Sequence, residues 1–291
     1  MTQSKLSRRH LLAAATLVAA LPCPLSAGES DGHTLRYKLK KGEQVVSRVT
    51  HFADTKTSMS GVSEDSTSRT TSEKIWEVTD VDADGDMTFV YRINYVNLAQ
   101  SVGEGEELKY NSLIDLEAPD IFKKVAETVN TPLATITING RGQVVERDKE
   151  LKNLQGVGEL TLPLPEEPVK VGGSWSVPRD LRVKMENGVH KKIKVRELYT
   201  LEKVVAGLAT IKIESQPLTP VSDPTVEAQL VQLLSKGVIK FDIDRGRLVK
   251  KELNWQEEVI GFRGPDTRLR YDAKFTEELV PKATRTASRS K

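Results

Sequence analysis

Alternating aspartates are the clearest candidate for chemistry in the sequence. Within the run 80–86 an aspartate stands at every second position, and Gly85 lies inside the run. The four are Asp80, Asp82, Asp84 and Asp86. This spacing matches the first half of a calcium loop, which a bidentate glutamate completes at the twelfth position. The twelfth position here is Tyr91. Two interpretations follow, a calcium site and a solvated acidic turn, and only the second needs no further ligand.

The remaining reactive side chains are scattered along the sequence. After residue 27 the histidines are His33, His51 and His190, and their spacing does not suit a zinc site. The stretch 172–176 (Gly-Gly-Ser-Trp-Ser) lacks the G-x-S-x-G pattern of a nucleophile elbow and is typical of a turn that opens a strand. We therefore predict no catalytic residue, no metal ligand and no cofactor, and we expect a protein that is not an enzyme.

Paired glutamates and the tryptophans also favour structural interpretations. Glu106-Glu107 and Glu257-Glu258 are typical of charged rims. Trp76, Trp175 and Trp255 are expected to anchor the core, because an indole ring buries a large apolar area. The functional alternative is that one of these rings lines a ligand cavity.

The N-terminus has the pattern of a secretory signal peptide over residues 1–27. Basic residues precede an apolar run at 11–21, and the small pair Ser26-Ala27 suits cleavage. The run is too short to span a bilayer. Residues 7–12 (Ser-Arg-Arg-His-Leu-Leu) resemble the twin-arginine export motif, and an ordinary signal with two arginines is the open alternative. Cys23 follows Pro22 where a lipid-anchor motif needs a small residue, so no anchor is expected.

Charge and cysteine content restrict the partners. The sequence has 43 basic and 41 acidic residues. Removal of residues 1–27 takes away three basic residues and no acid, which leaves 40 against 41, a formal charge of −1. Such a balance argues against nucleic acid and anionic membranes as main partners. Cys23 is the single cysteine, so no disulfide is expected after cleavage, and no later segment is apolar for long enough to cross a membrane.

The stretch 237–259 organises the rest of the chain. Its pattern predicts a strand, an Asp-Arg-Gly turn at 244–246 and a returning strand. Because strand side chains alternate between faces, one face of this ribbon is mostly apolar. That face holds Val249, Lys251, Leu253, Trp255, Glu257 and Val259. A shorter ribbon at 135–146 has a similar pattern.

Two helices are predicted, at 119–129 and 223–237. In the second, Asp223 suits the N-cap, Pro224 the first turn and Gly237 the C-terminal stop. The expected buried stripe of the first is Ile121, Phe122, Val125 and Val129. The expected buried stripe of the second is Val226, Leu230, Leu233 and Leu234.

The order of these elements predicts two similar β-rich units. The first covers 28–160, and the second covers 161–280 and opens with the Pro-rich connector. A basic, polar tail at 281–291 is expected to be disordered. The Ser/Thr-rich stretch 53–72 fits either a solvated hairpin or a mobile loop.

Short motifs at 39–42, 110–112, 162–165, 171–175 and 241–249 carry a resemblance over nearly the whole chain after residue 27. On these residues the sequence resembles an uncharacterised family of exported, duplicated proteins from planctomycete-like bacteria. That family implies no activity and no site residue. At the level of the fold, the pattern is similar to the half-barrels of periplasmic lipoprotein carriers, which shield a lipid in an apolar concavity.

We therefore expect a mainly β protein with a few helices, built from antiparallel curved sheets or a half-barrel. The first functional hypothesis is an exported, periplasmic or extracellular, non-catalytic binding protein with an apolar or lipid-like ligand in the concave face. The alternative is a structural or protein–protein interaction module of the cell envelope. A third, a hydrolase, requires catalytic groups from distant segments. An apolar cavity favours the first, and a filled core with an exposed edge strand favours the second.

Overall fold

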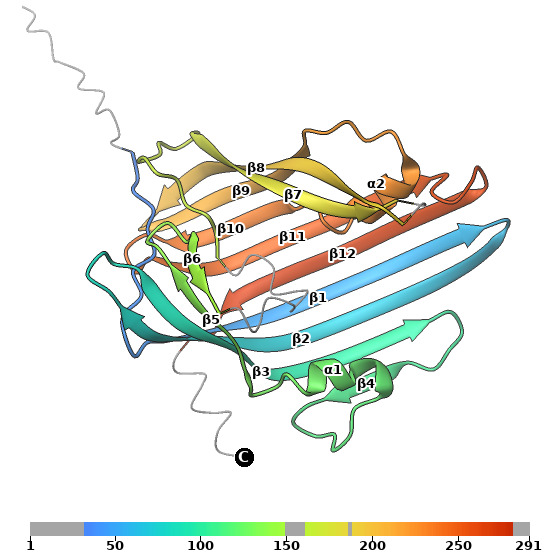
Figure 1. Ribbon diagram of the computed structural model, residues 1–291, viewed down its shortest axis with the longest axis horizontal. Helices are drawn as coiled ribbons and strands as arrows, with labels where there is room; N and C mark the ends of the chain where they lie inside the picture. Colours follow the sequence, from blue (N-terminus) through green and yellow to red (C-terminus); the bar gives the residue numbers. More distant parts are fainter. Residues whose placement is uncertain (1–31, 149–160, 186–187, 282–291) are drawn as a thin grey trace, which may run out of the picture. The chain divides into compact units, whose positions relative to one another are not determined.

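Twelve antiparallel strands form one open sheet in the computed structural model, which describes residues 32–148, 161–185 and 188–281 (Figure 1). The first six strands are β1 Gln44–Met59, β2 Val62–Val81, β3 Met87–Val102, β4 Leu108–Asn111, β5 Pro132–Ile138 and β6 Val144–Arg147. The other six are β7 Ser174–Lys184, β8 His190–Val205, β9 Leu208–Pro217, β10 Lys236–Asp242, β11 Arg247–Ile260 and β12 Thr267–Leu279. Their order is β6-β5-β3-β2-β1-β12-β11-β10-β9-β8-β7, and β4 pairs beside β3. The predicted mainly β, antiparallel fold is confirmed.

One face of the sheet carries the core. On β8 the buried side chains Ile193, Val195, Tyr199 and Leu201 lie at every second position, and β11 buries Leu253 and Val259 in the same way. We call this the inner face. The outer face carries ion pairs such as Arg48–Glu73 and Lys56–Asp65. The alternation predicted for 249–259 is therefore confirmed: one face of the sheet is buried, and the opposite face is exposed to solvent.

The sheet curls around the inner face. In a flat sheet β5 and β10, which are six strand spacings apart, would be separated by about 29 Å. However, the adjacent residues Tyr37 and Lys38 donate backbone hydrogen bonds to Gly140, after β5, and to Gly246, after β10. Only a strongly curved sheet brings these two turns to one short segment, as Figure 1 shows.

Two irregular segments fill one end of the curl. Residues 32–39 and 161–169 bury apolar side chains between the strands: Leu35, Tyr37, Leu39, Leu162, Leu164 and Val169. The small, polar residues 28–34 predict a frayed start, but His33 and Val169 exchange both backbone hydrogen bonds, so residue 33 is paired. Gly142 and Gly246 have positive φ, and a side chain at either would collide with the 36–38 segment. We call this region the filled end.

At the other end, helices lie on the inner face of the sheet. They are η1 Asp120–Phe122 with α1 Lys123–Ala126, beside β3, and α2 Pro224–Leu230, against β7 and β11. We call this region the open end.

The Ser/Thr-rich stretch 53–72 lies here within the β1–β2 hairpin, so the hairpin interpretation is confirmed. No helix in the described residues is long and apolar enough to cross a membrane.

Both helices are shorter than predicted. Asp223 caps α2 through its Oδ1, which accepts a hydrogen bond from the Thr225 N–H (2.9 Å). The helix ends near Leu230, because the N–H of Leu233 turns back to the Leu230 carbonyl in a tight turn. Leu233 is therefore exposed, which corrects the predicted stripe. Gly237 is not a helix stop but lies in β10, where a side chain would collide with the Glu252 carbonyl.

The two predicted units share local backbone features. The Gly42 N–H donates to the Val78 carbonyl (2.8 Å), and the Gly172 N–H donates to the Leu201 carbonyl (2.7 Å). Both glycines have positive φ, 79° and 86°. In each unit a helix follows the third long strand, after β3 and after β9. A duplication predicts these matches, and the duplication and its boundary at 160/161 stay predictions.

Several expectations fall outside the described residues. They concern the signal peptide 1–27 with Cys23, and the tail after Pro281. The Glu-Asn-Gly sequence at 186–188 predicts a turn, which lies mostly outside as well, since only Gly188 of it is described. All described residues belong to one unit, 31–291.

Candidate functional site

The acidic run 80–86 forms the turn between β2 and β3. Asp82 Oδ1 accepts hydrogen bonds from the backbone N–H groups of Asp84 (3.0 Å) and Asp86 (2.9 Å), so this carboxylate closes the turn. Lys41 Nζ lies 2.9 Å from Asp80 Oδ1, and this hydrogen bond holds the pKa of Asp80 below its usual value. In the described part of the chain, no three His, Cys, Asp or Glu side chains are placed to hold a metal ion.

The other sequence candidates lie apart from one another. His33 pairs with the connector, His51 lies on the inner face of β1, and exposed His190 opens β8. Ser174 Oγ bonds Thr200 Oγ1 across β7 and β8 (2.8 Å), as expected of a strand start. The structure therefore does not assemble these residues into one site.

The glutamate pairs divide in the structure. Glu107 contacts Arg69 (3.2 Å) and Lys109 (2.8 Å), and Glu258 contacts Arg268 (3.0 Å) on the outer face, so both are charged rims. Glu106 is exposed in the turn before β4. Glu257 lies on the inner face.

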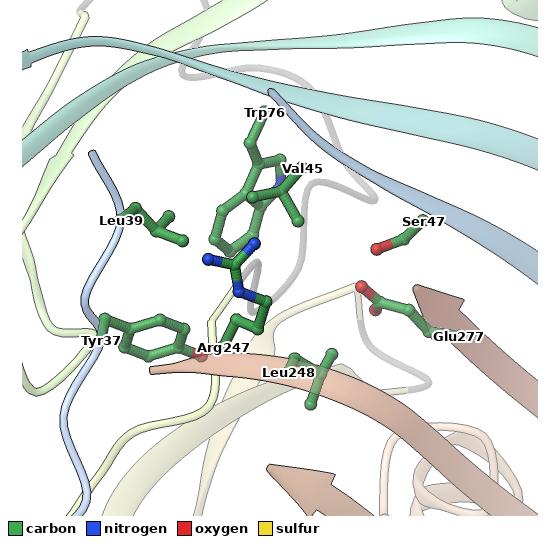
Figure 2. A pocket seen from close by; sticks show the side chains of 8 residues that line it. All are labelled: Tyr37, Leu39, Val45, Ser47, Trp76, Arg247, Leu248 and Glu277. Atoms are coloured by element: carbon green, nitrogen blue, oxygen red, sulfur yellow. The ribbon is translucent and has the colours of Figure 1, made fainter. Parts of the chain in front are cut away.

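The filled end leaves very small cavities. One of about 20 Å³ lies among Tyr37, Ser47, Trp76, Arg247 and Glu277, as Figure 2 shows. A second, of about 10 Å³, lies beside Tyr199 and Lys251. A cavity of this size holds about one water molecule. The functional alternative for the tryptophans is that one ring lines a ligand cavity. Trp76 does line a cavity, but this cavity has no room for a lipid.

Buried charges and phenols surround the larger of these cavities. Lys74 Nζ and Glu277 Oε1 form an ion pair of 2.5 Å in which both side chains are less than a tenth exposed. Burial, reinforced by the nearby Glu277 carboxylate, raises the pKa of Tyr91 to about 12. Burial likewise raises the pKa of Tyr37 far above its usual value, although the hydrogen bond from the Leu162 N–H opposes this. These phenols stay protonated at physiological pH, and the cluster has the character of a core.

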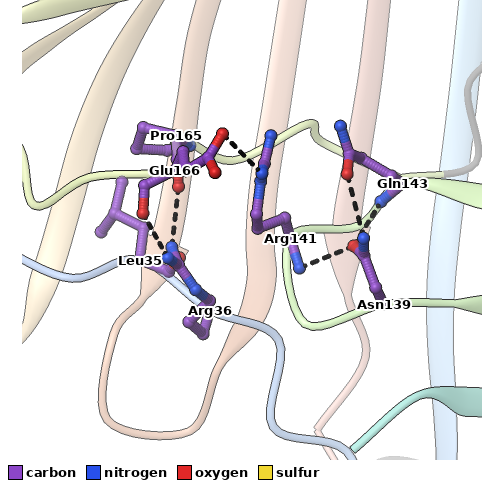
Figure 3. A network of polar contacts seen from close by, with 7 residues as sticks. All are labelled: Leu35, Arg36, Asn139, Arg141, Gln143, Pro165 and Glu166. Carbon is purple, nitrogen blue, oxygen red and sulfur yellow. Dashed lines mark hydrogen bonds and ion pairs between the residues drawn. The ribbon is translucent and has the colours of Figure 1, made fainter. Parts of the chain in front are cut away.

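A polar network fastens the irregular segments of the filled end (Figure 3). The Arg36 guanidinium donates to the carbonyls of Pro165 (2.7 Å) and Glu166. Arg141 Nη1 pairs with the Glu166 carboxylate at 3.0 Å, and its backbone N–H donates to Asn139 Oδ1 at 2.9 Å. Each of these groups is committed to holding segments together, so we assign the network a structural role.

A larger groove lies at the open end, beside α2. It has a volume of about 180 Å³, and its apolar wall is Val221, Leu230, Val231 and Leu234. At the volume that one water molecule needs, the groove has space for on the order of ten water molecules. Glu227 of α2 and Glu257 of β11 also line it. Hydrophobic periodicity alone missed this groove, because the predicted α2 stripe was expected to be fully buried.

Aromatic side chains lie behind the groove. The Trp255 indole N–H donates to the carbonyl of Leu234, a groove residue. Trp255 also packs edge-on against His51 (6.3 Å between ring centroids) and Tyr271 (6.4 Å). Burial lowers the pKa of His51, so its imidazole is held in the neutral form.

An exposed apolar patch lies on the other helix and the loop before it. Leu113, Ile114 and Leu116 in the loop, and Ile121 and Val125 on η1 and α1, are all exposed, with Leu116 fully so. The predicted stripe at 119–129 therefore buries only Phe122 completely and leaves its outer members in water. We call these five residues the α1 patch.

The hollows of the outer face are polar. One of about 280 Å³ is lined by Asp54, Lys56, Asp65, Arg270 and Asp272, among others, and one of about 340 Å³ by Lys56, Arg268 and Arg270. Their charges are largely paired with one another, as in Arg270–Asp272 (2.6 Å). Such surfaces suit solvent more than an apolar ligand.

No family model matches the sequence, and no curated protein matches it. The chain is similar to a solved structure titled "Lipid-protein interactions in lipovitellin", with 10% identity and a TM-score of 0.45 over 84% of this chain and 26% of that one. It is also similar to the Salmonella type III secretion injectisome secretin InvG in the open gate state, with 8% identity and a TM-score of 0.17 over 84% of this chain and 64% of that one.

The chain thus spans about a quarter of the lipovitellin chain and less than two thirds of the secretin chain. Likeness at these scores concerns the β architecture and carries no argument about ligand or partner.

Proposed function

We propose that this protein is an exported, non-catalytic binding protein that holds an apolar or amphipathic small molecule at the open end of its inner face. The groove beside α2 carries the proposal, because it combines an apolar wall with a volume of about 180 Å³. Concave apolar surfaces with a few polar groups are the usual small-molecule sites of proteins. Export to the periplasm or beyond rests on the N-terminal pattern alone.

The filled end supports this placement by contrast. Its cavities, about 20 and 10 Å³, have room for single waters. A lipid-like chain enclosed in the whole curl would have to displace the segments 32–39 and 161–169, whose side chains are buried in the core. We therefore place the ligand in the groove beside α2 and not within the filled end.

The fluorescence of Trp255 tests this proposal, because its indole is bonded to a groove residue. Titration of the purified protein with octan-1-ol is expected to change the Trp255 emission and to saturate in about the millimolar range. Val221→Phe, which fills the groove, should abolish the change. Val205→Phe, at the exposed end of β8, is the matched control and should leave it intact. A signal that does not saturate, or that persists in Trp255→Phe, contradicts the proposal.

A second candidate function, a protein-interaction module of the cell envelope, is favoured by the α1 patch. Large aliphatic side chains held in water commonly mark contact surfaces. Residues 104–127 around the patch contain seven acids and three bases, a formal −4. This surface fits a basic protein partner with an apolar centre and disfavours an anionic membrane.

Photo-crosslinking tests the second candidate. A photoreactive residue at position 116 in the exporting host is expected to give one discrete protein adduct, which Leu113→Ser weakens. The same residue at Thr50, exposed on the outer face of β1, should give none. Equal crosslinking at both positions contradicts the interaction module.

A further inference from the structure

The groove beside α2 carries two acidic groups. Glu227 comes from α2 and Glu257 from β11, two elements that pack together across the groove. In the described part of the chain, neither carboxylate has a hydrogen-bond or ion-pair partner on another side chain. Most acids on the long strands differ in this respect, as Glu73, Glu77 and Glu258 do, since each contacts a base.

The residues that line the groove include two acids and, among those described, no lysine or arginine. The other lining residues are apolar, among them Val221, Leu230 and Leu234. A ligand that enters such a groove places an apolar chain against the wall and meets negative potential at the rim. A cation gains from that potential, whereas a carboxylate of the ligand would face two like charges.

We propose that the groove selects a cationic amphiphile, a molecule with a short apolar chain and an ammonium or guanidinium head. The head lies between Glu227 and Glu257, and the chain lies along Val221, Leu230 and Leu234. This inference rests on the proposed function of the groove and adds the charge of its ligand.

Three ligands of one chain length separate the two proposals: octylamine, octan-1-ol and octanoate. Binding to the purified protein is followed through Trp255 at low salt, because surface charge pairs are screened by ions. Exposed ion pairs contribute modestly, so we expect octylamine to bind about fivefold more tightly than octan-1-ol, and octanoate to bind least tightly. Added salt should remove most of that preference.

Substitution of the acids assigns the preference to them. Glu227→Gln with Glu257→Gln is expected to remove the difference between the affinities of the variant for octylamine and for octan-1-ol. The matched control is Glu258→Gln, one residue along β11 on the outer face, which should keep the preference. Since both groove acids are exposed, the double variant is expected to fold, and its thermal unfolding verifies this.

The outcomes distinguish a failure of the predicted charge preference from a failure of the proposed binding function. If octan-1-ol binds in the groove and octylamine binds no more tightly, the inference is overturned while the binding function stands. If the preference persists in the double variant, the inference is also overturned. If none of the three ligands binds, both the inference and the proposed function are overturned.

Discussion

The filled end and the open end of the inner face follow the same strand alternation but have different contents. At the filled end the segments 32–39 and 161–169 complete the core, and the remaining cavities hold about one water each. At the open end short helices cover the face, and α2 leaves a groove of about 180 Å³. Alternation therefore decides which face is apolar, whereas the segments that pack on that face decide whether it forms a stable core or leaves space for a ligand.

The largest expected effect comes from emptying the filled end. Phe241 is fully buried and packs edge-on against Tyr37, with ring centroids 5.4 Å apart. Phe241→Ala should lower the free energy of unfolding by about 3–5 kcal/mol, measured by urea denaturation. Octan-1-ol binding should be unchanged while the variant is folded. The outer-face control Phe52→Ala is expected to cost less than about 1 kcal/mol, and equal losses would remove the distinction between core and surface.

The buried ion pair is expected to have the next largest effect. Lys74→Met leaves the Glu277 carboxylate without its partner in the core and should cost about 3 kcal/mol. Lys74→Met with Glu277→Leu removes both charges and should recover most of that loss, because no buried charge remains. Urea denaturation of the two single variants and the double variant gives the coupling free energy. Additive losses would contradict a direct pair.

A smaller effect is expected at the open end, from the cap of α2. Asp223→Ala removes the acceptor for the Thr225 N–H and should cost about 1 kcal/mol of unfolding free energy. Because α2 forms a wall of the groove, octan-1-ol binding should weaken as well. Asp223→Ser keeps a capping oxygen and should restore both quantities. If Asp223→Ala is destabilised but binds octan-1-ol unchanged, the claim that α2 forms a wall of the binding groove is contradicted.

The smallest expected effect is pH dependence through His51. Burial lowers the pKa of His51 in the folded protein below its ordinary 6.5. The unfolded chain then takes up a proton first as the pH falls. This contribution to stability is therefore complete above about pH 6.5 and is lost as the pH falls through the folded pKa. His51→Gln should flatten the change of melting temperature below pH 6.5, while exposed His190→Gln should not. Identical pH profiles for all three proteins would contradict a half-buried neutral His51.

Much of the sheet could be predicted from the sequence. The ribbon at 237–259 and the capping pair Asp223 and Pro224 follow from local rules of alternation and helix termination, and they are confirmed. The lengths of the helices could not be predicted in this way. Leu233 and Val125 follow the apolar spacing, yet tertiary packing ends α2 at Leu230 and exposes part of α1.

The groove could not be predicted because it depends on elements far apart in the chain. Glu257 has the pattern of a charged rim when β11 is considered alone, and only the approach of α2 brings Glu227 to the same groove. The filled end also depends on elements that are far apart in the chain. Tyr37 becomes a core residue because the turns at Gly140 and Gly246 bond to it and to the next residue, Lys38, and no local pattern contains that convergence.

Hydrogen–deuterium exchange with and without saturating octylamine tests the division of the inner face most directly. Our expectation is slower exchange in peptides that cover 217–234 and 253–259, and no change in those that cover 35–39 and 133–138. Protection in the filled-end peptides, or in residues 113–125 alone, would contradict it.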